Sequence, residues 1–193
     1  VIPLVGCVNR LAERLAASCG GLALTHPYGC SQMGEDHERT ANMLAQFCHH
    51  PNAGGVLVVA LGCENNTLES FKVRLGDYSR LNIRFLRAQD PGDEYAKGLA
   101  LLKELEAARP KDRVEVSASE LVVGLKCGGS DGFSGLTANP LVGRFSDWLA
   151  ARGGSTILTE VPEMFGAETL LMKRCRTRDV FDKCVRMIND FKD

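Results

Sequence analysis

The chain has 193 residues, of which 45% are hydrophobic and 24% charged, proportions typical of a folded globular domain rather than a disordered segment. Its 23 Lys and Arg residues are balanced by 24 Asp and Glu residues, so no excess of positive charge is available to bind a nucleic acid. The longest apolar run, residues 56–63, is too short to span a membrane, and we expect no signal peptide, no membrane partner and a cytoplasmic location.

The hydrophobic pattern predicts alternating strands and helices along the whole chain. Short apolar runs predict strands at residues 1–5, 22–25, 55–61, 81–86, 121–125 and 155–159. Apolar residues at helical spacing predict helices at residues 8–16 and 37–49, near 67, after 93, from 139, and twice near the end of the chain. Such alternation predicts an α/β fold, Rossmann-like in three layers, with a mostly parallel sheet.

One segment interrupts this pattern. Residues 108–120 are charged and contain few large apolar side chains, which favours a subdomain boundary there. We otherwise expect residues 1–193 to be one α/β core fragment of a longer enzyme, since the chain begins with Val rather than Met.

The loops that follow the predicted strands carry the candidate functional residues, because ligands of parallel α/β sheets bind at the carboxyl ends of the strands. These loops place thiols, an imidazole and carboxylates after the strands: Cys7, His26, Cys30, Cys63, Glu64, Cys127, Glu160 and Glu163. If they converge, such a set suits iron or zinc. The alternatives are thiols buried as small apolar groups, a histidine bonded to backbone carbonyls, and glutamates that complement a helix N-terminus.

The glycine-rich loop CGGSDGFSG, residues 127–135, is the most distinctive local motif. Backbone N–H groups in such a loop can bind an anion, but the lysine of a nucleotide-binding P-loop is missing. Its hydroxyl, carboxylate and amide groups suit a polyhydroxylated substrate. The alternative is a tight turn closed by its own Asp and Ser side chains.

Four stretches together resemble one enzyme family: THPYGCSQMGED (25–36), HPNAGGVLVVALGCENN (50–66), GLKCGGSDGFSGLTANPLVGRFSD (124–147) and TEVPEMFGAE (159–168). With the opening GCVNRLAERLA, they resemble the altronate dehydratase/galactarate dehydratase family of sugar-acid dehydratases over essentially the whole chain, and they fit the altronate branch better. Sulfolactate sulfo-lyases are similar in the same loops. Family members carry sequence before residue 1 and after residue 193, so the resemblance implies a central fragment whose partners are the missing N- and C-terminal regions of the same polypeptide.

The resemblance implies a requirement for Fe²⁺, or Mn²⁺, and the loss of water from a sugar acid, as in the conversion of D-altronate to 2-dehydro-3-deoxy-D-gluconate. An iron–sulfur cluster is the less favoured form of the metal, because the CxxC spacing common in such clusters is missing. The reaction needs a base for the C2 proton and an acid for the departing 3-hydroxyl. His26 is predicted for one of these roles, and Glu160 or Glu163 for the other.

The predicted metal ligands are Cys30, Cys63, Glu64 and Cys127. The residues predicted to bind the substrate are Ser31, Gln32, Ser130, Asp131 and Asn139. The alternatives left open are a galactarate dehydratase, a sulfolactate sulfo-lyase, and a non-catalytic domain that binds an anion or sugar acid. A homo-oligomer is also left open.

Overall fold

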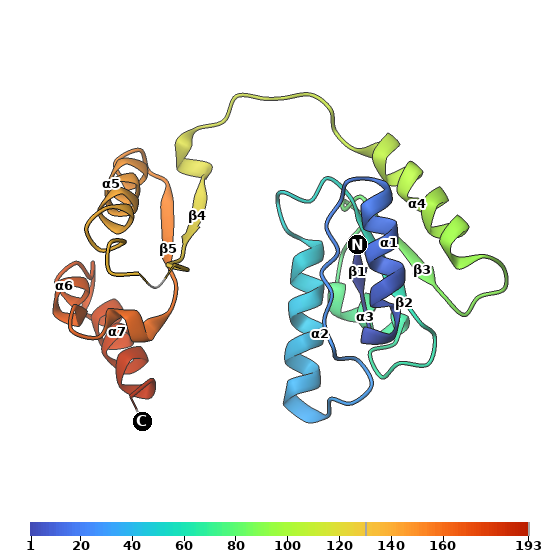
Figure 1. Cartoon of the computed structure of the whole chain (residues 1–193), viewed down its shortest axis with the longest axis horizontal. Helices are drawn as coiled ribbons and strands as arrows, with labels where there is room; N and C mark the ends of the chain where they lie inside the picture. The colour runs from blue at the N-terminus through green and yellow to red at the C-terminus, as the bar shows by residue number, and fades with distance from the viewer. Residues whose placement is uncertain (130, 193) are drawn as a thin grey trace. The chain divides into compact units, whose positions relative to one another are not determined.

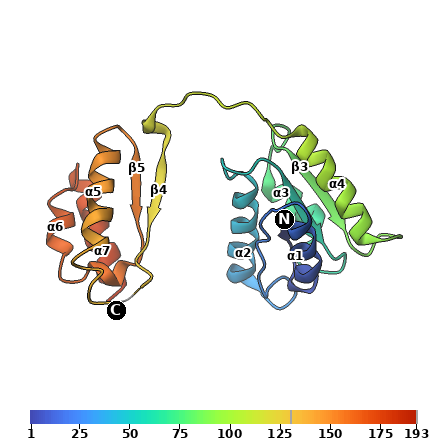
Figure 2. The same ribbon diagram turned by 45° about the horizontal axis from the view of Figure 1, so that its top comes forward.

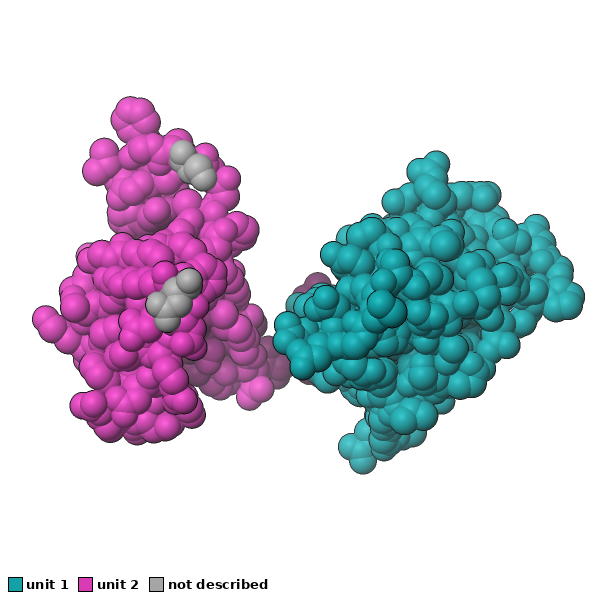
Figure 3. All heavy atoms as spheres, turned by 90° about the horizontal axis from the view of Figure 1, so that it is seen from below, with its two compact units in different colours: residues 1–112 teal, residues 113–193 magenta. Residues whose placement is uncertain are grey.

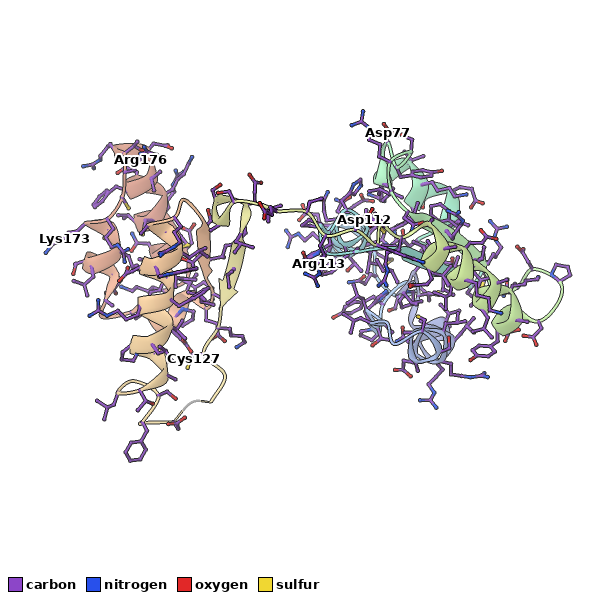
Figure 4. The ribbon with its side chains drawn as sticks, turned by 90° about the horizontal axis from the view of Figure 1, so that it is seen from above. Asp77, Asp112, Arg113, Cys127, Lys173 and Arg176 are labelled. Atoms are coloured by element: carbon purple, nitrogen blue, oxygen red, sulfur yellow. The ribbon has the colours of Figure 1, made fainter. Side chains whose placement is uncertain are left out.

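The computed structural model describes residues 1–129 and 131–192. It divides the chain into two compact units, Val1–Asp112 and Arg113–Asp193, which Figure 3 shows in different colours. The division falls within the charged segment 108–120, and Figure 4 labels Asp112 and Arg113 on either side of it. Each unit contains helices and its own parallel sheet, so the predicted α/β class is confirmed, although the strands form two sheets rather than one.

The first unit alternates strands and helices around a parallel sheet in the order β1-β2-β3 (Figure 1). Its elements are β1 (Ile2–Pro3), η1 (Gly6–Val8), α1 (Asn9–Ser18), α2 (Gly34–Cys48), β2 (Val56–Ala60), α3 (Leu68–Leu75), β3 (Ile83–Arg87) and α4 (Glu94–Ala108). Two of its helices begin at side-chain caps, because Thr67 Oγ1 accepts the Ser70 N–H and Asp93 Oδ1 accepts the Tyr95 and Ala96 N–H groups.

The central strand β2 separates two hydrophobic cores, which makes this unit three-layered as predicted. Val56, Val58 and Ala60 face the core formed with α2 and α3, while Leu57 and Val59 face the core formed with α1 and α4. Every residue of β2 is buried, as expected for the middle strand of a parallel sheet covered on both faces.

The strand predicted at residues 22–25 is absent from the described chain, so that prediction was wrong. This segment follows the Gly20-Gly21 turn and runs as irregular backbone. Its Leu24 N–H donates to the Val1 carbonyl at 3.0 Å, but the segment does not extend into a ladder. The short apolar run therefore packs beside the start of β1 without becoming part of the sheet.

The second unit contains η2 (Ala118–Glu120), β4 (Val122–Leu125), α5 (Ala138–Ala150), β5 (Ser155–Leu158), η3 (Val161–Met164), α6 (Glu168–Met172) and α7 (Arg178–Asp190). Strands β4 and β5 pair in parallel from Val122 with Ser155 to Leu125 with Leu158. Helix α5 lies along β5 (Figure 2), where Ser146 Oγ and Thr156 Oγ1 are 2.8 Å apart and Leu149 is fully buried. Both strands thus end on the same side, where the loops at 126 and 159 begin.

None of the helices in the described part of the chain is both long enough and apolar enough to cross a lipid bilayer.

Candidate functional site

The loop at residues 26–30 is fixed to the carboxyl edge of the first unit's sheet. Asn9 Nδ2 donates to the His26 carbonyl at 2.9 Å, and the Gly6 N–H donates to the Tyr28 carbonyl at 2.8 Å. Gly29 has a φ of 123°, and a Cβ there would lie 2.6 Å from Val5 Cα. Only glycine allows the loop to approach the backbone just after β1 this closely.

The His26 ring is part of this fixed loop. Its Nδ1 accepts the Tyr28 N–H at 3.2 Å, so the proton lies on Nε2, which donates to the Pro3 carbonyl at 2.9 Å. Both nitrogens are therefore engaged with backbone groups, the alternative that the sequence left open. To transfer a proton, His26 would have to break one of these bonds.

The loop after β2 carries two buried polar side chains, Glu64 and Asn66, which are 3% and 2% exposed. Glu64 Oε2 accepts the Gly62 N–H at 2.6 Å, whereas Glu64 Oε1 and Asn66 Oδ1 have no hydrogen-bond partner among the described residues. A buried oxygen without a partner is costly, so it usually marks a place for water, a cation or a ligand. These two oxygens suit a hard divalent cation.

The predicted metal-binding thiols are less buried than Glu64. Cys30 and Cys63 are exposed, and Cys127 is half-buried in the second unit. Within residues 1–129 and 131–192, no group of three or more His, Cys, Asp or Glu side chains is placed to hold a metal ion. Of the four predicted metal ligands, Glu64 is thus the one whose surroundings fit a cation.

Two further predicted residues, Ser31 and Gln32, follow Cys30 in the same loop. The Cys30 carbonyl accepts the Asn65 Nδ2–H at 3.1 Å, which joins this loop to the one after β2. Ser31 is exposed, and the half-buried Gln32 presents an Oε1 without a partner among the described residues. Gln32 therefore has an acceptor available for a ligand.

The second unit has a cavity of about 550 Å³ at the carboxyl ends of β4 and β5. Cys127, labelled in Figure 4, lies where the chain has just left β4, and it lines this cavity together with Asn139 and Glu163. Three predicted site residues from three different segments thus meet around one space. The volume lies within the range of roughly 300–1,000 Å³ common for small-molecule sites.

Glu160 forms an ion pair at this edge of the sheet. Its Oε1 lies 2.5 Å from Lys126 Nζ, and the Lys126 ammonium lowers the pKa of Glu160 while the carboxylate raises the pKa of Lys126. Glu160 is therefore held ionised and is poorly suited to donate a proton at neutral pH. It also has a left-handed backbone, with a φ of 65°.

The glycine-rich loop is closed by its own side chains. Asp131 Oδ1 accepts the Phe133 and Ser134 N–H groups, both at 2.9 Å, and Asp131 Oδ2 accepts the Ser134 hydroxyl at 2.7 Å. These bonds, chiefly those from Ser134, lower the pKa of Asp131 and match the turn that the sequence left open. The predicted residue Ser130 lies outside the described residues.

Sequence reasoning missed Lys126 and Arg174, the two cations that line this cavity. Lys126 directly precedes Cys127 in the motif GLKCGGSDGFSG, and its place at the end of a predicted strand was the available signal. Arg174 follows α6 and gives no comparable signal, because only the tertiary fold brings it to the cavity.

A second cavity, of about 490 Å³, lies in the first unit at the opposite edge of the sheet, where β1 and β2 begin. Apolar side chains dominate its lining, among them Leu22, Leu24 and Phe47. Because it lies at the amino ends of the strands, it is not where an α/β sheet presents its ligands.

Two family models match the chain. Residues 1–109 match the second domain of "D-galactarate dehydratase/Altronate hydrolase", and residues 118–193 match "D-galactarate/Altronate dehydratase, C-terminal".

Three curated relatives align over nearly the whole chain. The chain is 55% identical to altronate dehydratase of Bacillus subtilis (strain 168) and 48% identical to altronate dehydratase of Escherichia coli (strain K12), covering 100% of this chain and 41% of each relative. It is 31% identical to (2R)-sulfolactate sulfo-lyase subunit beta of Chromohalobacter salexigens over 99% of this chain and 49% of that protein. The chain therefore spans less than half the length of the relatives it matches.

Proposed function

Because the chain belongs to the D-galactarate dehydratase/altronate hydrolase family, we propose that it is the central part of a hydro-lyase that removes water from a sugar acid, with D-altronate as substrate. The observation that carries this proposal is the cavity where Cys127, Asn139 and Glu163 meet. An amide, a carboxylate and a thiol around a space of this size suit a small polyhydroxylated acid.

Glu163 is the proposed base that takes the C2 proton, and the carboxylic acid so formed is proposed to give that proton to the departing 3-hydroxyl, which leaves as water. Glu163 lines the cavity, whereas Glu160 is paired with Lys126 and both His26 nitrogens bond to backbone groups. Asn139 is the proposed donor to a substrate hydroxyl. In this proposal His26 fixes its loop to β1, and it acts in proton transfer only if the Tyr28 or Pro3 bond opens.

Iron(II) or manganese is the proposed cofactor, with Glu64 as its first protein ligand and Asn66, two residues later in the same loop, as a further oxygen donor. Both present a buried oxygen that lacks a partner among the described residues. When bound at this loop, a divalent cation would act as a Lewis acid toward a carboxylate or hydroxyl oxygen.

The test is turnover by the full-length polypeptide loaded with iron(II). We expect D-altronate to give 2-dehydro-3-deoxy-D-gluconate and sulfolactate to give no sulfite. Sulfite release without dehydration would instead support the sulfo-lyase alternative, which is suggested by a relative of lower identity, 31%. A folded, iron-loaded enzyme that turns over no sugar acid would exclude the hydro-lyase.

A set of variants tests whether this region is catalytic. We expect Glu163→Gln to lower kcat by roughly 10²- to 10⁴-fold, the usual contribution of a general base. Glu115→Gln is the control, because Glu115 is an exposed glutamate of the same unit that does not line the cavity. Turnover that survives His26→Asn, Glu160→Gln and Glu163→Gln together would favour a non-catalytic binding domain.

A further inference from the structure

Two positively charged side chains line the cavity of the second unit, and the proposed function assigns a role to neither of them. Lys126 extends from the end of β4, and Arg174 reaches the cavity from the segment after α6. The acidic residues on the lining are Asp147 and Glu163. A space with polar groups of both signs can hold an anion and its hydroxyl groups at the same time.

Lys126 is held close to the edge of the sheet. Its Nζ lies 2.5 Å from Glu160 Oε1 and 3.5 Å from the Cys127 carbonyl, and its side chain is 63% exposed. An ion pair in contact with water contributes little to stability, so a carboxylate that enters the cavity can replace or share Glu160 as the partner at small cost. These contacts place the Lys126 ammonium at the edge of the sheet and are weak enough for the carboxylate of a ligand to compete with them.

Arg174 is less firmly paired than Lys126. Its Nη2 lies 3.9 Å from Asp147 Oδ1, beyond hydrogen-bond distance, and both side chains are exposed. A guanidinium binds a carboxylate best through two parallel N–H bonds, and Asp147 does not provide that geometry here. Arg174 therefore adds positive charge near the cavity without being neutralised by a close contact.

We propose that this cavity binds the carboxylate of the sugar acid, that Lys126 contacts it, and that Glu160 is the positioning residue that holds Lys126 in place. The inference rests on the proposed function for the identity of the ligand. A carboxylate next to an ammonium would also be stabilised as the C2 proton leaves, because charge then builds up on the carboxylate.

Alkylation of Cys127 provides a test that does not depend on turnover. Cys127 lines the cavity and is half-buried, so a bound ligand should shield it from the neutral reagent iodoacetamide. In the full-length polypeptide, mass spectrometry of the Cys127 peptide would follow the alkylation rate against increasing D-altronate. The uncharged D-altritol, which has the same carbon chain, is the matched probe.

We expect D-altronate to protect Cys127 and D-altritol to protect it little. Lys126→Met should raise the concentration of D-altronate needed for protection by roughly 10- to 100-fold, the effect of losing one hydrogen bond to a charged group. Lys126→Arg should restore part of the affinity. Lys183→Met is the control, because Lys183 is also ion-paired, 2.8 Å from Asp179 on α7, but does not line the cavity.

The role of Glu160 is tested by a double-mutant cycle. Glu160→Gln should weaken protection less than Lys126→Met does, and the double variant should bind no more weakly than Lys126→Met alone. Additive losses would show that Glu160 does not act through Lys126. Unchanged protection in Lys126→Met would overturn the inference even if the enzyme dehydrates altronate, whereas charge-dependent protection without turnover would leave it standing and remove the proposed function.

Discussion

Both units are built from parallel strands followed by helices, but they differ in how much of each strand is buried. In the first unit all five residues of β2 are buried between two cores. In the second unit every residue of β4 and β5 is at least partly exposed, with Val122 at 64%, Ile157 at 54% and Leu158 at 51%. The central strand of the first sheet is covered on both faces, whereas the second sheet exposes apolar side chains that further protein can cover.

The candidate site residues of the two units also differ in their burial. In the first unit, Glu64 and Asn66 are buried with oxygens that lack partners among the described residues. In the second unit, Lys126 and Glu163 line an open cavity in contact with solvent. Buried groups are fixed before a ligand arrives, while exposed groups need an ion pair or a ligand to fix them.

The largest expected effect is a loss of stability caused by a substitution in the first unit's core. Phe71 is fully buried on α3, so Phe71→Ala should lower the free energy of unfolding by about 3–5 kcal/mol. Val73→Ala on the same helix is the control, because Val73 is 82% exposed and should change stability by less than about 0.5 kcal/mol. Urea denaturation measures both, and equal losses would contradict the two-core description.

Glycine substitutions test how tightly the site loop is fixed to that core. Gly29→Ala should cost more than the roughly 1–3 kcal/mol of backbone strain alone, because the new Cβ would also meet Val5. Gly76→Ala is the matched control: its φ is also positive, at 67°, but nothing lies within 4 Å of the added Cβ. Thermal unfolding compares the stability of the two variants. A smaller loss of stability for Gly29→Ala than for Gly76→Ala would mean that the loop can move to make room for the added Cβ.

A substitution on β5 tests whether the second unit's surface is covered. In the isolated 193-residue chain, Ile157→Thr should change the free energy of unfolding by less than about 0.5 kcal/mol, because Ile157 is half exposed. In the full-length polypeptide the same change should cost about 1 kcal/mol or more if further protein packs on β5. Equal small effects in both proteins would show that the strand stays exposed to water.

The smallest expected effect concerns the titration of Glu160. Lys126 lowers the pKa of Glu160, so the ion pair contributes stability above the ordinary glutamate value and loses it as the pH falls through the lowered value. Lys126→Met should move the pKa of Glu160 up toward its ordinary value, as measured by carbon-13 NMR of the carboxyl group. An unmoved pKa would mean that the pair does not form in solution.

Much of the fold follows from local patterns in the sequence. The apolar run around β2 and the helix starts predicted near residue 67 and after residue 93 correspond to elements that the structure contains, and the structure adds the caps at Thr67 and Asp93. Local patterns do not specify which strands pair, so the division into two sheets was not predicted. Nor do they reveal bonds between segments distant in sequence, which is why the Pro3 contact of His26 and the Glu160 contact of Lys126 had to come from the structure.

Glu160 is the single non-glycine residue with a positive φ within the described chain. A side chain in that conformation costs on the order of 1 kcal/mol relative to glycine, which adopts it freely. Replacing Glu160 with glycine should therefore make the second unit harder to unfold while leaving Lys126 without its counter-ion. The turn at Glu160 is therefore a position where a gain in stability and the loss of the Lys126 ion pair would come from the same substitution.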